Sequence, residues 1–91
     1  MKFVLFYTSA PDVAAKAGPV FAAHKAHYEQ FLARGVLLLL GTFEDAQADG
    51  SMAVFTTREA AEEFAAADPF VLNGVVTSYQ IKGWNEAIGG S

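Results

Sequence analysis

The sequence predicts an α+β domain in which two helices cover one face of a four-stranded antiparallel sheet. Four short segments rich in β-branched and aromatic residues alternate with two helix-period segments in the order β-α-β-β-α-β. The length of 91 residues suits one domain, expected at residues 1–88 with a flexible tail at 89–91. Hydrophobic residues make up 53% of the chain, a surplus for so small a core, which indicates self-association.

The first strand is predicted at residues 2–8 (KFVLFYT), where β-branched and aromatic side chains dominate. Turn-forming residues at 9–12 end it. Residues 13–18 contain enough alanine for a helix, but Gly18 and Pro19 indicate that the main helix begins afresh there.

The main helix is predicted at residues 18–35, with Gly35 as the residue that follows its last turn. At about 100° per residue, His24, Tyr28 and Phe31 fall on one apolar face. His24 should therefore point toward the core, where its ring nitrogens need hydrogen-bond partners.

The next two strands form a predicted hairpin. Residues 36–40 are a continuous apolar run of strand length, which continues toward residues 42–43. The acidic segment 44–50 ends in Asp-Gly and is expected to be a loop. Residues 51–56 (SMAVFT) are the third strand.

A second helix follows, capped by Thr56 or Thr57. It should end at Asp68, because Pro69 disfavours helical geometry in the residue before it. One short helical turn is expected at residues 69–74.

The last strand is predicted at residues 75–84, with Val75, Thr77, Tyr79 and Ile81 on one side and the even-numbered residues on the other. The complete order of elements is that of a ferredoxin-like domain. Its second sheet face carries no helix but is apolar in the first two strands. We therefore expect a homodimer that packs sheet against sheet, since large apolar side chains left in water would each forgo about 1.5–3 kcal/mol.

Composition excludes several classes of protein. The chain has no cysteine, which removes disulfides and thiol nucleophiles. The net charge of −4 and six scattered basic residues do not suit nucleic-acid binding. The sequence shows no signal peptide, and its longest apolar run is too short to cross a bilayer. A cytoplasmic protein that does not bind membranes is expected.

His24 is the first candidate for chemistry. It could be a core histidine bonded to a neighbouring group, or a general acid or base, because free imidazole titrates near neutrality. His27, three residues later, makes a metal pair conceivable. Helical metal pairs usually have i,i+4 spacing with an added carboxylate, so we predict no metal site.

Asp68 is the second candidate. It could simply cap the short turn that begins at Pro69. However, it lies at the carboxyl end of a helix, where the helix dipole disfavours a negative charge. A residue that breaks a local rule is a candidate for function, and a carboxylate here could orient His24.

Three further residues are candidates for contact with a small molecule. Tyr28 and Phe31 lie on the same helix face as His24 and could line a pocket, although Tyr28 could equally be a core residue. Ser9 follows the first strand and could contact a ligand or belong to an ordinary turn. The sequence contains no glycine-rich phosphate loop, and we predict no cofactor.

The chain resembles the YciI-like (YCII-related) family of small dimeric α+β-barrel proteins. The resemblance extends from residue 2 to residue 84. It rests on His24 eleven residues before Gly35, an apolar strand that ends at Gly41, and the sequence Ala-Asp-Pro-Phe at 67–70. It implies a ferredoxin-like protomer, a dimer, and a histidine–aspartate dyad in a pocket near the subunit interface.

Carried over residue by residue, the resemblance assigns the dyad to His24 and Asp68. Two positions depart from the pattern of many relatives, because Phe21 replaces a basic residue and Thr42 replaces a proline. Both departures argue against an anionic or polar substrate, and the apolar Phe21 indicates a more hydrophobic pocket. One branch of the family is similar to enzymes that eliminate chloride from hydroxylated aromatic compounds.

Two functions are consistent with these observations. The first is a cofactor-independent enzyme in which His24, oriented by Asp68, moves a proton during isomerisation or elimination on a small, aromatic or otherwise apolar molecule. The second is a non-catalytic ligand-binding or accessory dimer in which the same pair only holds the helices together. A partner-binding surface at the Trp84 end of the last strand is a third hypothesis.

Overall fold

The computed structural model describes residues 1–89. The last two residues of the predicted tail, 90 and 91, lie outside the described residues. In chain order the elements are β1 (Lys2–Ser9), α1 (Val13–Ala17), the 3₁₀ turn η1 (Gly18–Val20), α2 (Phe21–Ala33), β2 (Leu37–Thr42), α3 (Ala46–Asp49), β3 (Ser51–Phe55), α4 (Arg58–Ala67), α5 (Pro69–Leu72) and β4 (Val76–Trp84).

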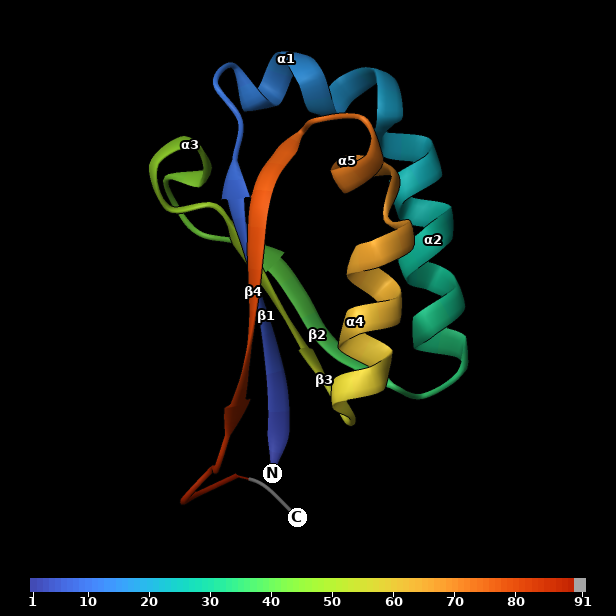
Figure 1. The fold of residues 1–91 in the computed structure, drawn as a ribbon, viewed down its shortest axis with the longest axis vertical. Helices are drawn as coiled ribbons and strands as arrows, with labels where there is room; N and C mark the ends of the chain where they lie inside the picture. The colour runs from blue at the N-terminus through green and yellow to red at the C-terminus, as the bar shows by residue number, and fades with distance from the viewer. Residues whose placement is uncertain (90–91) are drawn as a thin grey trace.

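The four strands form one antiparallel sheet in the order β2-β3-β1-β4. The helices α2 and α4 lie side by side on one face of this sheet (Figure 1). This arrangement confirms the predicted α+β, ferredoxin-like fold. Within residues 1–89, no helix has the length and apolar character that crossing a membrane requires.

The main helix starts differently in the structure than the sequence predicts. Helical structure begins at Val13, and Gly18 keeps helical backbone angles (φ −49°, ψ −56°), so it does not interrupt the chain of α1, η1 and α2. Pro19 fits within η1 because the first turn of a helix needs no N–H at that position. The predicted end is confirmed, since Gly35 has a φ of +75° and its N–H donates to the Leu32 carbonyl.

The segment 44–50 is also more ordered than predicted. It contains the single turn α3, and the Asp45 side chain caps this turn by accepting a hydrogen bond from the Ala48 N–H at 3.1 Å. Gly50 then returns the chain to β3 with a φ of +75°. The sequence left two candidates for the cap of α4, Thr56 and Thr57. Thr57 is the cap, since its hydroxyl accepts from the Ala60 N–H.

The predicted alternation of β4 is wrong at its start. Thr8 pairs with Ser78 but Ser9 pairs with Val76, so Thr77 is an extra residue that forms a β-bulge. The bulge shifts the side-chain phase by one residue. Val76 therefore packs in the same core as Ile81, although strict alternation would place these two on opposite faces.

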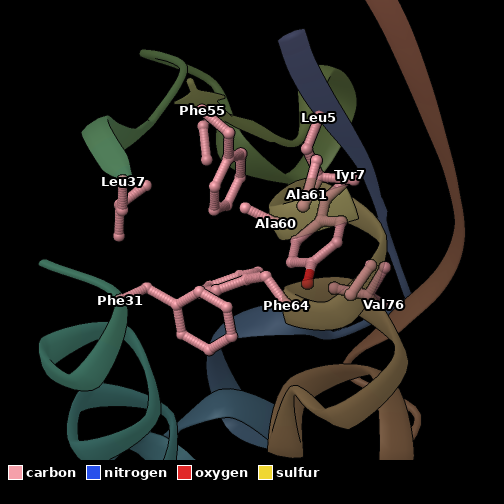
Figure 2. Packing of buried hydrophobic residues seen from close by; sticks show 11 residues of the cluster. Leu5, Tyr7, Phe31, Leu37, Phe55, Ala60, Ala61, Phe64 and Val76 are labelled. Carbon is pink, nitrogen blue, oxygen red and sulfur yellow. The ribbon is translucent and has the colours of Figure 1, made fainter. Parts of the chain in front are cut away.

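The core lies between the sheet and the two long helices. Figure 2 shows Phe31 of α2, Phe55 of β3 and Phe64 of α4 packed together. Their rings meet in edge-on or tilted contacts, with centroids 5.1–6.4 Å apart. These contacts fix α2 and α4 against the sheet and so determine where their polar side chains point.

The opposite sheet face is apolar, as predicted. Val4 pairs with Val54, and Val54 pairs with Leu39, so these three side chains share one face. Phe6, Met52 and Trp84 lie on the same face. Leu39 and Trp84 remain 69% and 52% exposed, and α2 and α4 lie on the other side of the sheet (Figure 1).

Candidate active site

Three elements bring polar side chains to one buried point. β1 contributes Tyr7, α2 contributes His24, and the corner between α4 and α5 contributes Asp68. The His24 Nδ1 atom lies 2.7 Å from Asp68 Oδ1. His24 is only 6% exposed and Asp68 is completely buried. The structure therefore brings together the two residues predicted to form a dyad.

Asp68 contacts His24 and also caps the short helix α5. Its Oδ1 atom accepts a hydrogen bond from the Phe70 N–H at 3.0 Å, which caps α5. Its Oδ2 atom accepts a second hydrogen bond from the Tyr7 hydroxyl at 2.7 Å. The carboxylate thus has three donors around it, which compensates for its burial.

The hydrogen bonds around Asp68 also set its ionisation. Burial alone would raise the pKa of the Asp68 carboxyl, but the donors His24, Tyr7 and the Phe70 N–H together outweigh burial and lower this pKa below its usual range. The pKa of the Tyr7 hydroxyl is raised, first by burial and then by the negative charge of Asp68. At neutral pH the site therefore contains an ionised Asp68 and a protonated Tyr7.

An ionised Asp68 determines which nitrogen of His24 carries a proton. A carboxylate can only accept, so the Nδ1 atom of His24 donates to it. Within residues 1–89, the Nε2 atom has no hydrogen-bond partner. The ring is held in place by Phe70, stacked on it at 3.7 Å between centroids, and by the edge contact of Tyr28 at 5.3 Å. The arrangement orients an imidazole whose second nitrogen is available to a ligand.

His24 lines a cavity of about 160 Å³ between the sheet and α2. Its walls are mostly apolar and include Leu5, Phe21 and Leu40. Among the described residues, no Asp, Glu, Lys or Arg side chain lines it. Since an apolar cavity of about 150 Å³ can hold benzene, this one has room for a single aromatic ring.

The other predicted site residues divide between this cavity and other places. Tyr28 lines the cavity with His24. Phe31 does not, because it packs in the core against Phe55 and Phe64. Ser9 lines a neighbouring cavity, and its hydroxyl donates to the Ala46 carbonyl at 2.6 Å.

His27 lies apart from the dyad. Its Nε2 atom donates to the Phe64 carbonyl at 2.9 Å, and its ring packs between Phe31 and Phe64. In the part of the chain that the structure describes, no group of three His, Asp or Glu side chains is arranged to hold a metal ion.

Sequence reasoning missed Tyr7 as a site residue. One signal could have identified it, because a tyrosine that faces the helices from an apolar strand has a hydroxyl that must find a partner once buried. Figure 2 shows its hydroxyl pointing away from β1 toward the helices. The acceptor is contributed 61 positions later in the chain, so no local pattern connects the two residues.

Comparison with known proteins identifies a family and a similar solved structure. The YCII-related domain matches residues 1–85. The structure is similar to that of 5-chloro-2-hydroxyhydroquinone dehydrochlorinase from Burkholderia phenoliruptrix in complex with 2,5-dihydroxybenzoquinone. The TM-score is 0.73 and the sequence identity 19%, over 93% of this chain and 94% of the other. No curated protein sequence matches the chain.

Proposed function

Because this chain belongs to the YCII-related domain family, we propose that it is a cofactor-independent enzyme that moves a proton on a small aromatic or otherwise apolar molecule. The observation that carries this proposal is the buried His24–Asp68 pair at a cavity that, among the described residues, no Asp, Glu, Lys or Arg side chain lines. The structural neighbour, a dehydrochlorinase bound to a dihydroxybenzoquinone, supports a ring-sized substrate.

In the proposed reaction, the Nε2 atom of His24 is the general base. It takes a proton from a C–H or O–H group of the bound ring, and the released electron pair forms a new π bond. In an elimination, a leaving group such as chloride departs with its bonding pair. In an isomerisation, the imidazolium returns the proton to a different atom. Asp68 stabilises the imidazolium through Nδ1–H, as a buried carboxylate does in other histidine pairs.

Tyr28 has a proposed role in binding. It lines the same cavity as His24, and its ring meets the imidazole edge-on. It would therefore lie beside a ring placed over His24 Nε2. Phe31 and Ser9 have no such position and are not part of the proposed catalytic centre.

The alternative function is a ligand-binding or accessory protein in which the dyad is structural. The complete hydrogen bonding of Asp68 and the stacking of His24 on Phe70 favour it, because a pair used only for packing would also be satisfied in this way. Under this alternative, loss of His24 lowers stability strongly but leaves ligand affinity nearly unchanged.

Replacement of each histidine by glutamine separates the two functions. Phenols and hydroquinones are first added to the protein while NMR follows both imidazole rings, and a ligand that shifts His24 but not His27 identifies the cavity as the binding site. Chloride release from chlorinated hydroquinones is then measured. We expect His24→Gln to lower turnover about 10²- to 10⁴-fold, the usual range for a general base.

The matched control is His27→Gln, because His27 lies on the same helix but bonds only to a backbone carbonyl. It should keep turnover within a few-fold of the wild type. Equal losses in both variants, or a folded His24→Gln protein with undiminished turnover, would contradict the proposed role of His24.

We also propose that the protein functions as a homodimer through its exposed sheet face. Leu39 and Trp84 share this face with Val4 and Val54, and a second copy would remove the exposed apolar surface of Leu39 and Trp84 from water. Lys82 lines the same surface and would be the charged group nearest to such an interface.

A further inference from the structure

A second cavity adjoins the one that contains His24. Its volume is about 210 Å³, and it lies where α1 crosses the end of the sheet (Figure 1). Val13, Ala14 and Ala17 of α1 line one side, and Val76 of β4 with the preceding Val75 lines another. The two cavities share three lining residues, namely Thr42, Ser51 and Phe70.

The shared residues are two with hydroxyl groups and one with an aromatic ring. Thr42 and Ser51 are direct partners across β2 and β3, and within residues 1–89 neither hydroxyl has a hydrogen-bond partner. Phe70 is the ring that stacks on His24. The junction therefore offers two hydroxyls and an aromatic ring. Among the described residues, no Asp, Glu, Lys or Arg side chain lines either cavity.

α1 covers the second cavity without filling it. None of the residues of α1 is buried. The helix is nevertheless held in position, because the Gln47 side chain accepts from the Val13 N–H at 3.0 Å and donates to the Ala10 carbonyl at 2.8 Å. The space beneath α1 is thus bounded by a segment with a defined position and few core contacts.

We infer that the two cavities form one bipartite site for a ring that carries an uncharged apolar substituent. The ring occupies the cavity of His24, and the substituent passes Thr42, Ser51 and Phe70 into the cavity beneath α1. This inference rests on the proposed function, because it uses the same ring position beside His24. The inference goes further by naming the class of substrate. A single ring already fills the first cavity, so any larger group needs the second cavity.

The charge of the lining residues also favours an uncharged substituent. Burial of a charged substituent is costly unless an opposite charge pairs with it, and within residues 1–89 no ionisable side chain lines the second cavity, where the substituent would lie. A carboxylated or phosphorylated tail should therefore bind poorly. The hydroxyls of Thr42 and Ser51 can satisfy one polar atom at the point where the substituent joins the ring.

The test measures the affinity of para-alkylphenols of increasing chain length, from p-cresol to p-butylphenol, by NMR titration of the full-length protein. A bipartite site predicts that each added methylene tightens binding about three- to fourfold, the gain expected when a methylene leaves water. The carboxylated probe of similar length, 3-(4-hydroxyphenyl)propionate, should bind at least tenfold more weakly than p-propylphenol.

Two variants, each with an alanine of α1 replaced by phenylalanine, then test whether the second cavity causes the tighter binding of longer chains. Ala17→Phe places a ring in the second cavity, and we expect it to abolish the dependence on chain length while p-cresol binds as in the wild type. Ala15→Phe is the matched control, because Ala15 belongs to the same helix but is exposed and lines neither cavity. It should keep the wild-type dependence.

The outcomes separate this inference from the proposed function. If p-cresol shifts His24 but longer chains bind no more tightly, the bipartite site is wrong and the proposed site beside His24 stands. The inference is also wrong if both phenylalanine variants keep the gain with chain length. If neither p-cresol nor any longer phenol binds near His24, the proposed function and the bipartite site are both wrong.

Discussion

At the scale of single residues, the buried carboxylate of Asp68 connects β1, α2 and α5 through one side chain. Tyr7 donates to one of its oxygens, while His24 and the Phe70 N–H donate to the other. Loss of a single donor leaves a buried charge with fewer partners, which costs more than an average hydrogen bond. Tyr7 is the donor that can be removed with the smallest change in shape.

Tyr7→Phe should lower the free energy of unfolding by about 1.5–3 kcal/mol at neutral pH, the range for hydrogen bonds to charged groups. The folded-state pKa of Asp68 lies below its unfolded value, so the ionised carboxylate stabilises the fold above a pH of about 4, and this stabilisation is lost as the pH falls through the folded pKa. The difference between variant and wild type should therefore shrink below this pH. Denaturant unfolding between pH 7 and pH 3 measures it.

Tyr79→Phe is the control for this prediction. Tyr79 touches the Tyr7 ring edge-on, but its side chain is 44% exposed, and its hydroxyl has no hydrogen bond among the described residues. Its replacement should change stability by less than about 0.5 kcal/mol. A loss in Tyr7→Phe that stays constant across the whole pH range would show that packing, rather than the ionised Asp68, explains it.

The same residues show how far sequence reasoning reaches at this scale. Helical periodicity was enough to place His24 inward, and the conflict between Asp68 and its helix dipole was enough to select it. Tyr7 and Phe70 could not be assigned in this way, since their roles depend on how β1 meets the α4–α5 corner. That meeting is a tertiary contact with no local signature.

At the scale of elements, the turn at Gly50 determines how β3 is placed beside β1. Gly50 has a φ of +75° and a ψ of −142°, a region that is essentially restricted to glycine. A Cβ atom there would also overlap the backbone carbonyl oxygen of Tyr7. The turn thus lies directly against the strand that carries the site tyrosine.

Gly50→Ala should therefore destabilise the protein by more than about 3 kcal/mol, because backbone strain and the overlap with β1 add together. Gly35→Ala is the matched control. Gly35 has the same φ of +75°, but apart from its two chain neighbours no described residue has an atom within 4 Å of where its Cβ would be. It should cost about 1–2 kcal/mol, the strain of a left-handed backbone alone. Thermal and denaturant unfolding of both variants would reveal equal losses if the contact with Tyr7 were unimportant.

Element types were predictable where periodicity was long, and element boundaries were not. The strands and the two main helices follow from their patterns of apolar residues. The bulge at Thr77 is invisible in the sequence, because it arises from the pairing of β4 with β1. The single turn α3 was hidden by polar residues that also suit a loop, although Asp45 is a favourable cap for it.

At the scale of the whole molecule, the two faces of the sheet differ in what covers them. α2 and α4 cover one face, whereas the other presents Leu39 and Trp84 to solvent. Alternation along β1 and β3 gives this face valine, phenylalanine and methionine instead of the polar residues that a solvated face usually has. A second copy packed against it would explain why the sequence is so hydrophobic.

Leu39→Glu tests the proposed dimer. If Leu39 becomes buried against a second copy, an unpaired carboxylate there should weaken dimerisation at least about 100-fold, as measured by sedimentation equilibrium. The unfolding free energy of the protomer should change little, because Leu39 is 69% exposed within it. Leu72→Glu is the control, since Leu72 is 67% exposed but belongs to α5 on the helical side. A wild-type protein that sediments as a single protomer, or a Leu39→Glu variant that remains dimeric, would contradict the proposed dimer through this face.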